Sequence, residues 1–124
     1  AWFNPASKLT DWIPEAKPQP GEMTFEHPLP SAYSASRFVD YMSNIRSVRC
    51  ILIGFSLDET ILATAVDGFH RSHRYQVIGD AVACRQPATG DAAAYRDAVV
   101  NVIANFATIH PSAELIRTSG AIAV

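Results

Sequence analysis

The apolar positions divide the chain into an irregular first part and a regular second part. Six of the eight prolines lie within the first 30 residues, which excludes a long helix or a central strand there. Trp2, Phe3, Trp12 and Ile13 make this stretch too apolar for a free linker, so we expect it to lie against its own domain or a neighbouring subunit. The pattern predicts two parts, an extended arm over residues 1–22 and a folded domain over residues 23–124.

Within the second part, short apolar runs alternate with apolar residues at helical spacing. The runs predict strands at residues 23–26, 48–54, 75–79 and 107–109. The helical spacing predicts helices at about residues 36–44, 58–71, 92–106 and 111–117. The run at 48–54 is continuous, which is typical of a strand buried on both faces of a parallel sheet. Regular alternation of strand and helix predicts an α/β fold with a mainly parallel sheet.

Helix starts are marked by residues that cap helices. Ser34 or Ser36 can cap the first helix, Ser56 or Asp58 the second, and Asp91 the third.

Composition narrows the class of protein. The 124 residues carry 10 basic and 12 acidic side chains, a net charge of −2, which does not favour a nucleic-acid binder. No apolar run approaches the roughly 18 residues of a membrane span, and the N-terminus lacks a signal-peptide pattern.

Cys50 and Cys84 can pair in principle, but each borders an apolar run, which favours buried free thiols and a reducing, cytoplasmic setting.

Three places offer candidate chemistry. The segment Gly54–Thr60 joins a strand to a helix, so its backbone N–H groups are placed to bind an anion or a developing oxyanion. An ordinary capped turn explains the same residues. His27 follows the first expected strand and is either a general base or a surface histidine before a proline turn. Asp80 is either a site residue or a turn residue.

Neither a GxGxxG nor a GxxxxGK[ST] pattern occurs, and no cysteine–histidine cluster has metal-ligand spacing, so we expect no cofactor and no metal.

The same residues carry a family likeness. The matching segments are Gly54–Ala65, then Asp67 and His70-Arg71, then Val77–Ala83, with weaker matches at 18–34 and 112–116. Together they resemble the isochorismatase-like cysteine hydrolases, in which a G-x-x-T-x-x-C-V-x-x-T-A segment is followed by a D-A-x-A motif. The resemblance implies a three-layer α/β/α, Rossmann-like fold and hydrolysis of small amides or vinyl ethers.

The resemblance also implies roles for individual residues. Thr60 stands at the position of the family's nucleophilic cysteine, and His27 at that of its lysine. The oxyanion donors would be the N–H groups of Ser56 and Thr60, and the family's cis peptide would fall at Phe55-Ser56. The side chains near this turn allow two interpretations: Phe55, Tyr33 and Leu57 either line an apolar pocket for a small molecule or pack in the core. The family's first strand, which carries its catalytic Asp, has no counterpart here.

These departures leave two hypotheses. A threonine hydroxyl ionises far less readily than a thiol and needs a dedicated base, so the first hypothesis is a hydrolase homologue that uses Thr60 and His27. The second is an inactive family member that serves as a binding or assembly subunit. A sheet without its leading strand has an unpaired edge, so we expect a homo-oligomer, with no nucleic-acid or membrane partner.

Overall fold

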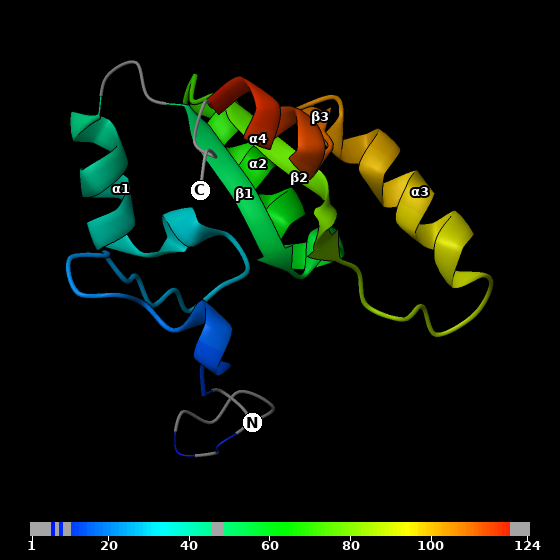
Figure 1. The fold of residues 1–124 in the computed structure, drawn as a ribbon, viewed down its shortest axis with the longest axis horizontal. Helices are drawn as coiled ribbons and strands as arrows, with labels where there is room; N and C mark the ends of the chain where they lie inside the picture. Colours follow the sequence, from blue (N-terminus) through cyan, green and yellow to red (C-terminus); the bar gives the residue numbers. More distant parts are fainter. Residues whose placement is uncertain (1–5, 7, 9–10, 46–48, 120–124) are drawn as a thin grey trace.

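A three-stranded parallel sheet organises the structure, a computed structural model that describes residues 6, 8, 11–45 and 49–119 (Figure 1). The strands lie in chain order β1-β2-β3. The elements in chain order are η2 (Pro14–Ala16), η3 (Ala32–Ser34), α1 (Ser36–Asn44), β1 (Cys50–Phe55), η4 (Leu57–Ile61), α2 (Leu62–His70), β2 (Tyr75–Ala83), α3 (Ala92–Ile103), β3 (Thr108–His110) and α4 (Ser112–Ser119).

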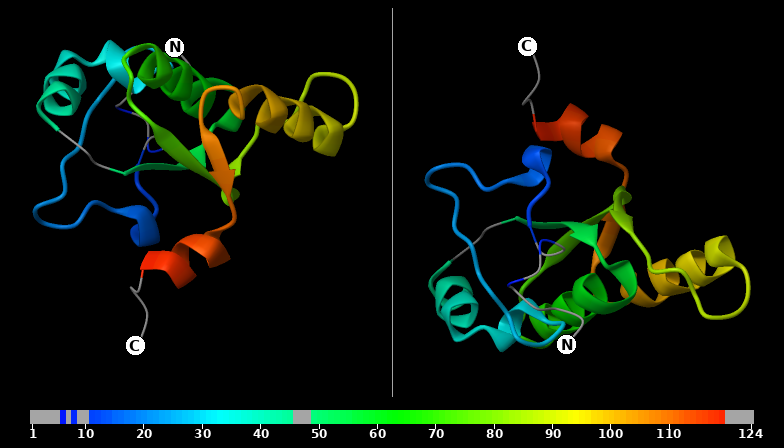
Figure 2. Two further views of the ribbon diagram at one scale, coloured as in Figure 1. Left: turned by 90° about the horizontal axis from the view of Figure 1, so that it is seen from above. Right: turned by 90° about the horizontal axis from the view of Figure 1, so that it is seen from below.

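Helices cover the sheet from both sides. Helices α2 and α3 lie on one face and α4 lies on the other, so the predicted α/β layering is confirmed (Figure 2). The main core fills the space between the sheet and helices α2 and α3. Its fully buried members are Leu57, Ile61, Ala65, Val77 and Ile103.

A second core cluster joins the segment before α1 to the start of β2. Tyr33, Met42 and Tyr75 are its buried members. Helix α2 passes so close to Tyr75 that a Cβ on Gly68 would lie 2.2 Å from Cε2 of that ring. A residue without a side chain is therefore required where α2 crosses β2.

Strand β2 carries a bulge opposite the end of β1. Leu52 pairs with Val77, but Gly54 pairs with Val82, so two steps along β1 correspond to five along β2. The residues from Ile78 to Ala81 consequently have no register partner on β1. Bulges of this kind bend a strand and redirect its side chains, and the expected strand at 75–79 extends through this bulge to Ala83.

The prediction that the strand around 48–54 is buried on both faces was wrong. Successive side chains of a strand point to opposite faces, and β1 packs Cys50 and Leu52 against the core while Ile51, Ile53 and Phe55 are exposed. Ile53 and Phe55 are 62% and 65% exposed, respectively. The reason is that α4, the helix on the outer face of the sheet, packs over β2. Among the described residues, the outer face of β1 is therefore left uncovered.

The predicted strand at residues 23–26 was also wrong. This segment forms no ladder with any described strand. A strand exists only with a hydrogen-bonded neighbour, and within the described sheet β1 pairs only with β2.

Helix caps matched the predictions in part. Asp91 caps α3 by accepting the Ala94 N–H at 2.7 Å, as predicted. Helix α1 begins after Ala35 without a side-chain cap, whereas Ser31 caps η3. Ser56 occupies the cap position of η4, but its side chain makes no capping hydrogen bond.

Both cysteines are free thiols, as expected, but they are half-buried rather than buried. Among the described helices, none combines the length and the apolar character that a membrane crossing requires.

Candidate functional site

The turn that follows β1 is the most unusual backbone in the described chain. Gly54 adopts a positive φ of 106°, and the next peptide bond but one, Phe55-Ser56, is cis. Glycine tolerates such a φ without steric cost. The cis bond lies where the family resemblance placed it, so that prediction is confirmed.

A single π-helical turn, η4, carries the chain from this cis bond into α2. The Ile61 N–H donates to the Ser56 carbonyl at 3.0 Å, which closes the wide ring typical of a π turn. Such turns are frequent at functional sites because they shift the following side chains relative to an α-helix. Thr60 lies on this turn and is half-buried, next to the buried Ile61.

The chain from Leu57 to His70 is helical throughout, so Thr60 lies in the first turns of a continuous helical run. Helix amino ends present N–H groups without intrahelical partners and carry partial positive charge. The site is therefore suited to negative charge near Ser56 and Thr60.

Asp58 fixes this turn to the rest of the domain. Its carboxylate accepts hydrogen bonds from Tyr95 Oη at 2.9 Å and from Arg85 Nε at 3.0 Å. The side chain is only 2% exposed. Arg85 also lies 3.7 Å from the Glu59 carboxylate. The turn is thus held by two elements that follow it in the chain, α3 and the segment after β2.

The hydrogen bonds set the charge state of Asp58. Burial of the carboxyl acts to raise its pKa, but hydrogen bonds from Tyr95 and Arg85 outweigh it and lower the pKa to about 2. Asp58 is therefore a permanent anion near neutral pH, suited to anchoring the turn and unsuited to accepting a proton. We predicted Asp58 only as a possible cap, because Arg85 and Tyr95 lie too far along the chain to give a local signal.

Cys84 follows the end of β2, close to the Asp58 carboxylate. Burial and this negative charge raise the pKa of the Cys84 thiol. Because the thiolate is the reactive form, this raised pKa makes the Cys84 thiol a weak nucleophile near neutral pH.

His27 lies elsewhere among the described contacts. It is exposed, and its Nδ1 is 2.5 Å from the Leu29 carbonyl oxygen. His27 lines an open cleft of about 1050 Å³ together with Trp12 and Phe25. Thr60 is not among the described residues that line this cleft, so the described contacts do not bring the two candidate residues together.

The two remaining predicted site residues have different surroundings. Phe55 is exposed beside the turn. Tyr33 is buried, and its hydroxyl lies 2.7 Å from Tyr75 Oη and 2.6 Å from His73 Nδ1. His73 and Tyr75 follow α2 in the chain, and the Tyr33 hydroxyl lies beside Gly68 near the carboxyl end of that helix. Gly68 is about 12 Å along the helix from Thr60 at 1.5 Å per residue. The structure therefore places Tyr33 in the core and away from the turn.

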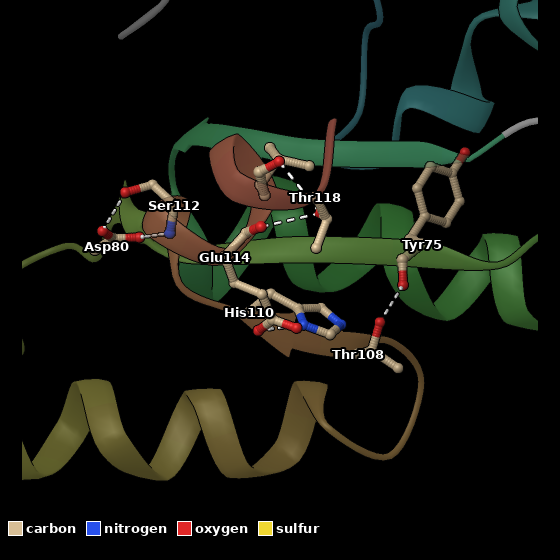
Figure 3. A network of polar contacts seen from close by, with 8 residues as sticks. Tyr75, Asp80, Thr108, His110, Ser112, Glu114 and Thr118 are labelled. Atoms are coloured by element: carbon tan, nitrogen blue, oxygen red, sulfur yellow. Dashed lines mark hydrogen bonds and ion pairs between the residues drawn. The ribbon is translucent and has the colours of Figure 1, made fainter. Parts of the chain in front are cut away.

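Asp80 has a structural contact. It lies in the β2 bulge, and its carboxylate accepts hydrogen bonds from the Ser112 N–H at 2.8 Å and Ser112 Oγ at 2.6 Å (Figure 3). These bonds lower the pKa of the Asp80 carboxyl and cap the amino end of α4. The interpretation of Asp80 as a turn residue was wrong, because Asp80 lies within β2, and its described contacts give it a capping role.

Comparison with known proteins relates the whole of this architecture to one family. An isochorismatase domain model matches residues 1–114. A search of curated proteins gave no match.

Solved structures share the fold. An isochorismatase from Pseudomonas putida is 24% identical, with a TM-score of 0.77 over 84% of this chain and 56% of its own. N-carbamoylsarcosine amidase from Thermoplasma acidophilum is 26% identical, with a TM-score of 0.64 over 86% of this chain and 58% of its own. An isochorismatase-family hydrolase from Oleispira antarctica is 18% identical, with a TM-score of 0.81 over 93% of this chain and 64% of its own. The chain thus spans less than two thirds of the length of each of these structures.

Proposed function

The chain belongs to the isochorismatase family, and on that premise we propose that it acts as a hydrolase on a small amide or vinyl ether at the η4 turn. The observation that carries this proposal is the arrangement of the turn itself. Ser56 and Thr60 lie at the amino end of a long helical run. Asp58 fixes the turn in place by accepting hydrogen bonds from Tyr95 and Arg85. Rigid placement of donors is what oxyanion stabilisation requires.

The chemistry of the proposal follows from the charge that hydrolysis creates. When a nucleophile adds to an amide carbonyl, the carbonyl oxygen becomes an oxyanion. The N–H groups of Ser56 and Thr60 are the proposed donors to that oxygen. Thr60 Oγ1 is the proposed nucleophile, and its proton passes to a base as the Oγ1–C bond forms. The C–N bond then breaks, the departing amine takes that proton, and water cleaves the resulting ester to release the acid and restore Thr60. His27 is the candidate base by resemblance, and this role requires it to approach Thr60, which the described contacts do not bring about. One structural neighbour is named as an amidase, which supports an amide as the first substrate class to test.

A substrate screen with matched variants tests the proposal. N-carbamoylsarcosine, simple primary amides and isochorismate are offered to the protein, to Thr60→Ala and to His27→Ala. Thr118→Ala is the control, because that hydroxyl bonds only carbonyls of its own helix among the described residues. We expect Thr60→Ala to lower turnover at least 100-fold, on the order of the usual contribution of a positioned catalytic group. Turnover that survives both substitutions would remove Thr60 and His27 from the reaction.

The second candidate function is an assembly subunit, which the exposed outer face of β1 favours. Ile51, Ile53 and Phe55 form an apolar row on a strand whose second edge is unpaired among the described residues. An open edge is a template for pairing with another chain. The proposed occupant is a second copy of this chain, because two β1 edges related by a two-fold axis can pair with each other. Such pairing places the two apolar rows side by side on one face, where cross-strand side chains contact.

Light scattering at micromolar concentration tests this second function. We expect a dimer that Ile53→Glu dissociates. Val102→Glu on α3, another exposed apolar position, is the control and should leave the dimer intact. A monodisperse monomer at these concentrations would exclude the assembly.

A further inference from the structure

A second cleft lies at the opposite end of the domain from the η4 turn. It has a volume of about 590 Å³, within the range of small-molecule sites. Its walls come from the segment after α2, the start of β2 and the α3–β3 connection. The lining residues are Arg49, Phe69, Ser72, His73, Arg74, Tyr75, Gln76 and 104–108.

The charge of this lining has one sign. Arg49 and Arg74 contribute guanidinium groups, whereas none of the described lining residues is Asp or Glu. The ion pairs of the described chain involve Arg85 and His110, so neither Arg49 nor Arg74 has a carboxylate partner there. Guanidinium groups without internal partners are the side chains best suited to a planar carboxylate.

An aromatic wall stands beside these charges. Phe69 is 54% exposed, and its ring meets that of Phe106 edge to face at a centroid distance of 5.6 Å. The exposed ring offers a flat apolar surface against which another ring can pack.

A buried hydrogen-bond chain orients His73 in the same cleft. Tyr33 Oη contacts His73 Nδ1 on one side and Tyr75 Oη on the other. Burial raises the pKa of Tyr33, so its hydroxyl keeps its proton near neutral pH. With Nδ1 engaged, Nε2 is the ring nitrogen left for a ligand, and no described residue bonds it.

From these features we propose that the cleft between Arg49, Arg74 and Phe69 is a binding site for a small aromatic carboxylate. The guanidinium groups neutralise the carboxylate, the His73 ring supplies a further polar contact, and Phe69 packs against the ligand ring. The site is separate from the η4 turn, since its lining shares no residue with that turn and meets α2 only at Phe69, near the carboxyl end of the helix.

Titration with benzoate, followed by amide chemical shifts of the isotope-labelled protein, tests the site. Benzamide removes the charge and acetate removes the ring, so the two probes separate the contributions. We expect benzoate to shift the amides of residues 69–76 and 104–108, with benzamide and acetate each at least 10-fold weaker. Arg49→Gln combined with Arg74→Gln should weaken benzoate at least 10-fold, whereas Arg117→Gln, on exposed α4, should leave it unchanged.

Three results would overturn the proposal. Shifts spread evenly over all arginines would indicate non-specific ion pairing. Unchanged binding in the double variant would exclude the two arginines from the site and leave Arg74 only a role near the carboxyl end of α2, where cations complement the helix dipole. Shifts confined to residues 56–61 would place benzoate at the η4 turn, which would remove the second site while supporting the proposed function.

Discussion

Tyr95 Oη donates a hydrogen bond to the Asp58 carboxylate at 2.9 Å, and this contact ties helix α3 to the turn that carries Thr60. Because a buried carboxylate that loses a donor keeps its desolvation cost, we expect Tyr95→Phe to destabilise the protein by about 1–2 kcal/mol. Urea unfolding measures the change. Tyr41→Phe is the control, because Tyr41 is exposed, and it should change stability by less than about 0.5 kcal/mol. Equal effects of the two substitutions would contradict the assigned anchor.

The low pKa of Asp58 predicts how stability responds to acid. Its pKa falls from an ordinary value of 3.8 to about 2 on folding, so the folded state favours the ionised form. The resulting stabilisation is fully present above about pH 5 and is lost as the pH falls through about 2, to the extent of roughly 2–2.5 kcal/mol. Unfolding free energies measured between pH 2 and pH 6 should fall less steeply in Asp58→Asn, and identical slopes would show that Asp58 titrates normally.

Gly68 should not tolerate alanine, although alanine is the better helix former. A Cβ at this position would lie 2.2 Å and 2.7 Å from two carbons of the Tyr75 ring, which is itself buried. We expect Gly68→Ala to cost about 2 kcal/mol or more, against a gain of about 1 kcal/mol from helix propensity. Ala63→Gly on the same helix should cost only about 1 kcal/mol. The melting temperatures of both variants, measured by thermal unfolding, give the two stability changes. A Gly68→Ala protein more stable than the original would show that α2 can move away from β2.

Placing a thiol at the turn probes its electrostatics without any substrate. The helix amino end should lower the pKa of the thiol introduced by Thr60→Cys below about 8.5, the value of a free cysteine. The rate of alkylation by iodoacetamide as a function of pH, with the modified site identified by mass spectrometry, measures it. Burial raises the pKa of Cys50 and contributes to raising that of Cys84, so both serve as internal references. A new thiol that titrates with these two would leave the turn without the proposed affinity for negative charge.

The capping contact of Asp80 makes a local prediction. Asp80→Ala removes both acceptors at the start of α4, and loss of a cap costs about 1 kcal/mol. Because the contact joins α4 to the β2 bulge, hydrogen exchange should accelerate in residues 112–119 and remain unchanged in α2. Acceleration over the whole domain would assign Asp80 a global role.

Local patterns predicted most elements, because each depends on neighbouring residues. The spacing of apolar positions located α1, α2 and α3, and Asp91 marked the start of α3 correctly. The strand at 23–26 failed for a different reason, since a strand depends on a partner that its own residues do not specify. The same limit explains β1, whose apolar run predicted burial that the neighbouring layers do not provide.

The candidate site was predictable only as far as the family motif extends. Gly54, Phe55-Ser56 and Thr60 lie within one continuous segment, and their backbone arrangement matched the resemblance. The anchor of that segment was not predictable, because Arg85 and Tyr95 reach Asp58 from 27 and 37 residues away. Tyr33 shows the reverse case, in which a motif position belongs to a core network with Tyr75 and His73.

Among the described strands, the order β1-β2-β3 places β2 beside β1 and β3 beside β2, the strand that precedes each in the chain. These three strands can therefore join the sheet in the order in which they leave the ribosome, and none of the three has to be inserted between two that are already paired. Shortening the chain from its carboxyl end would remove strands from the outside inward. A chain ending after Gly90 would retain both partners of the β1–β2 ladder, together with the whole of the η4 turn.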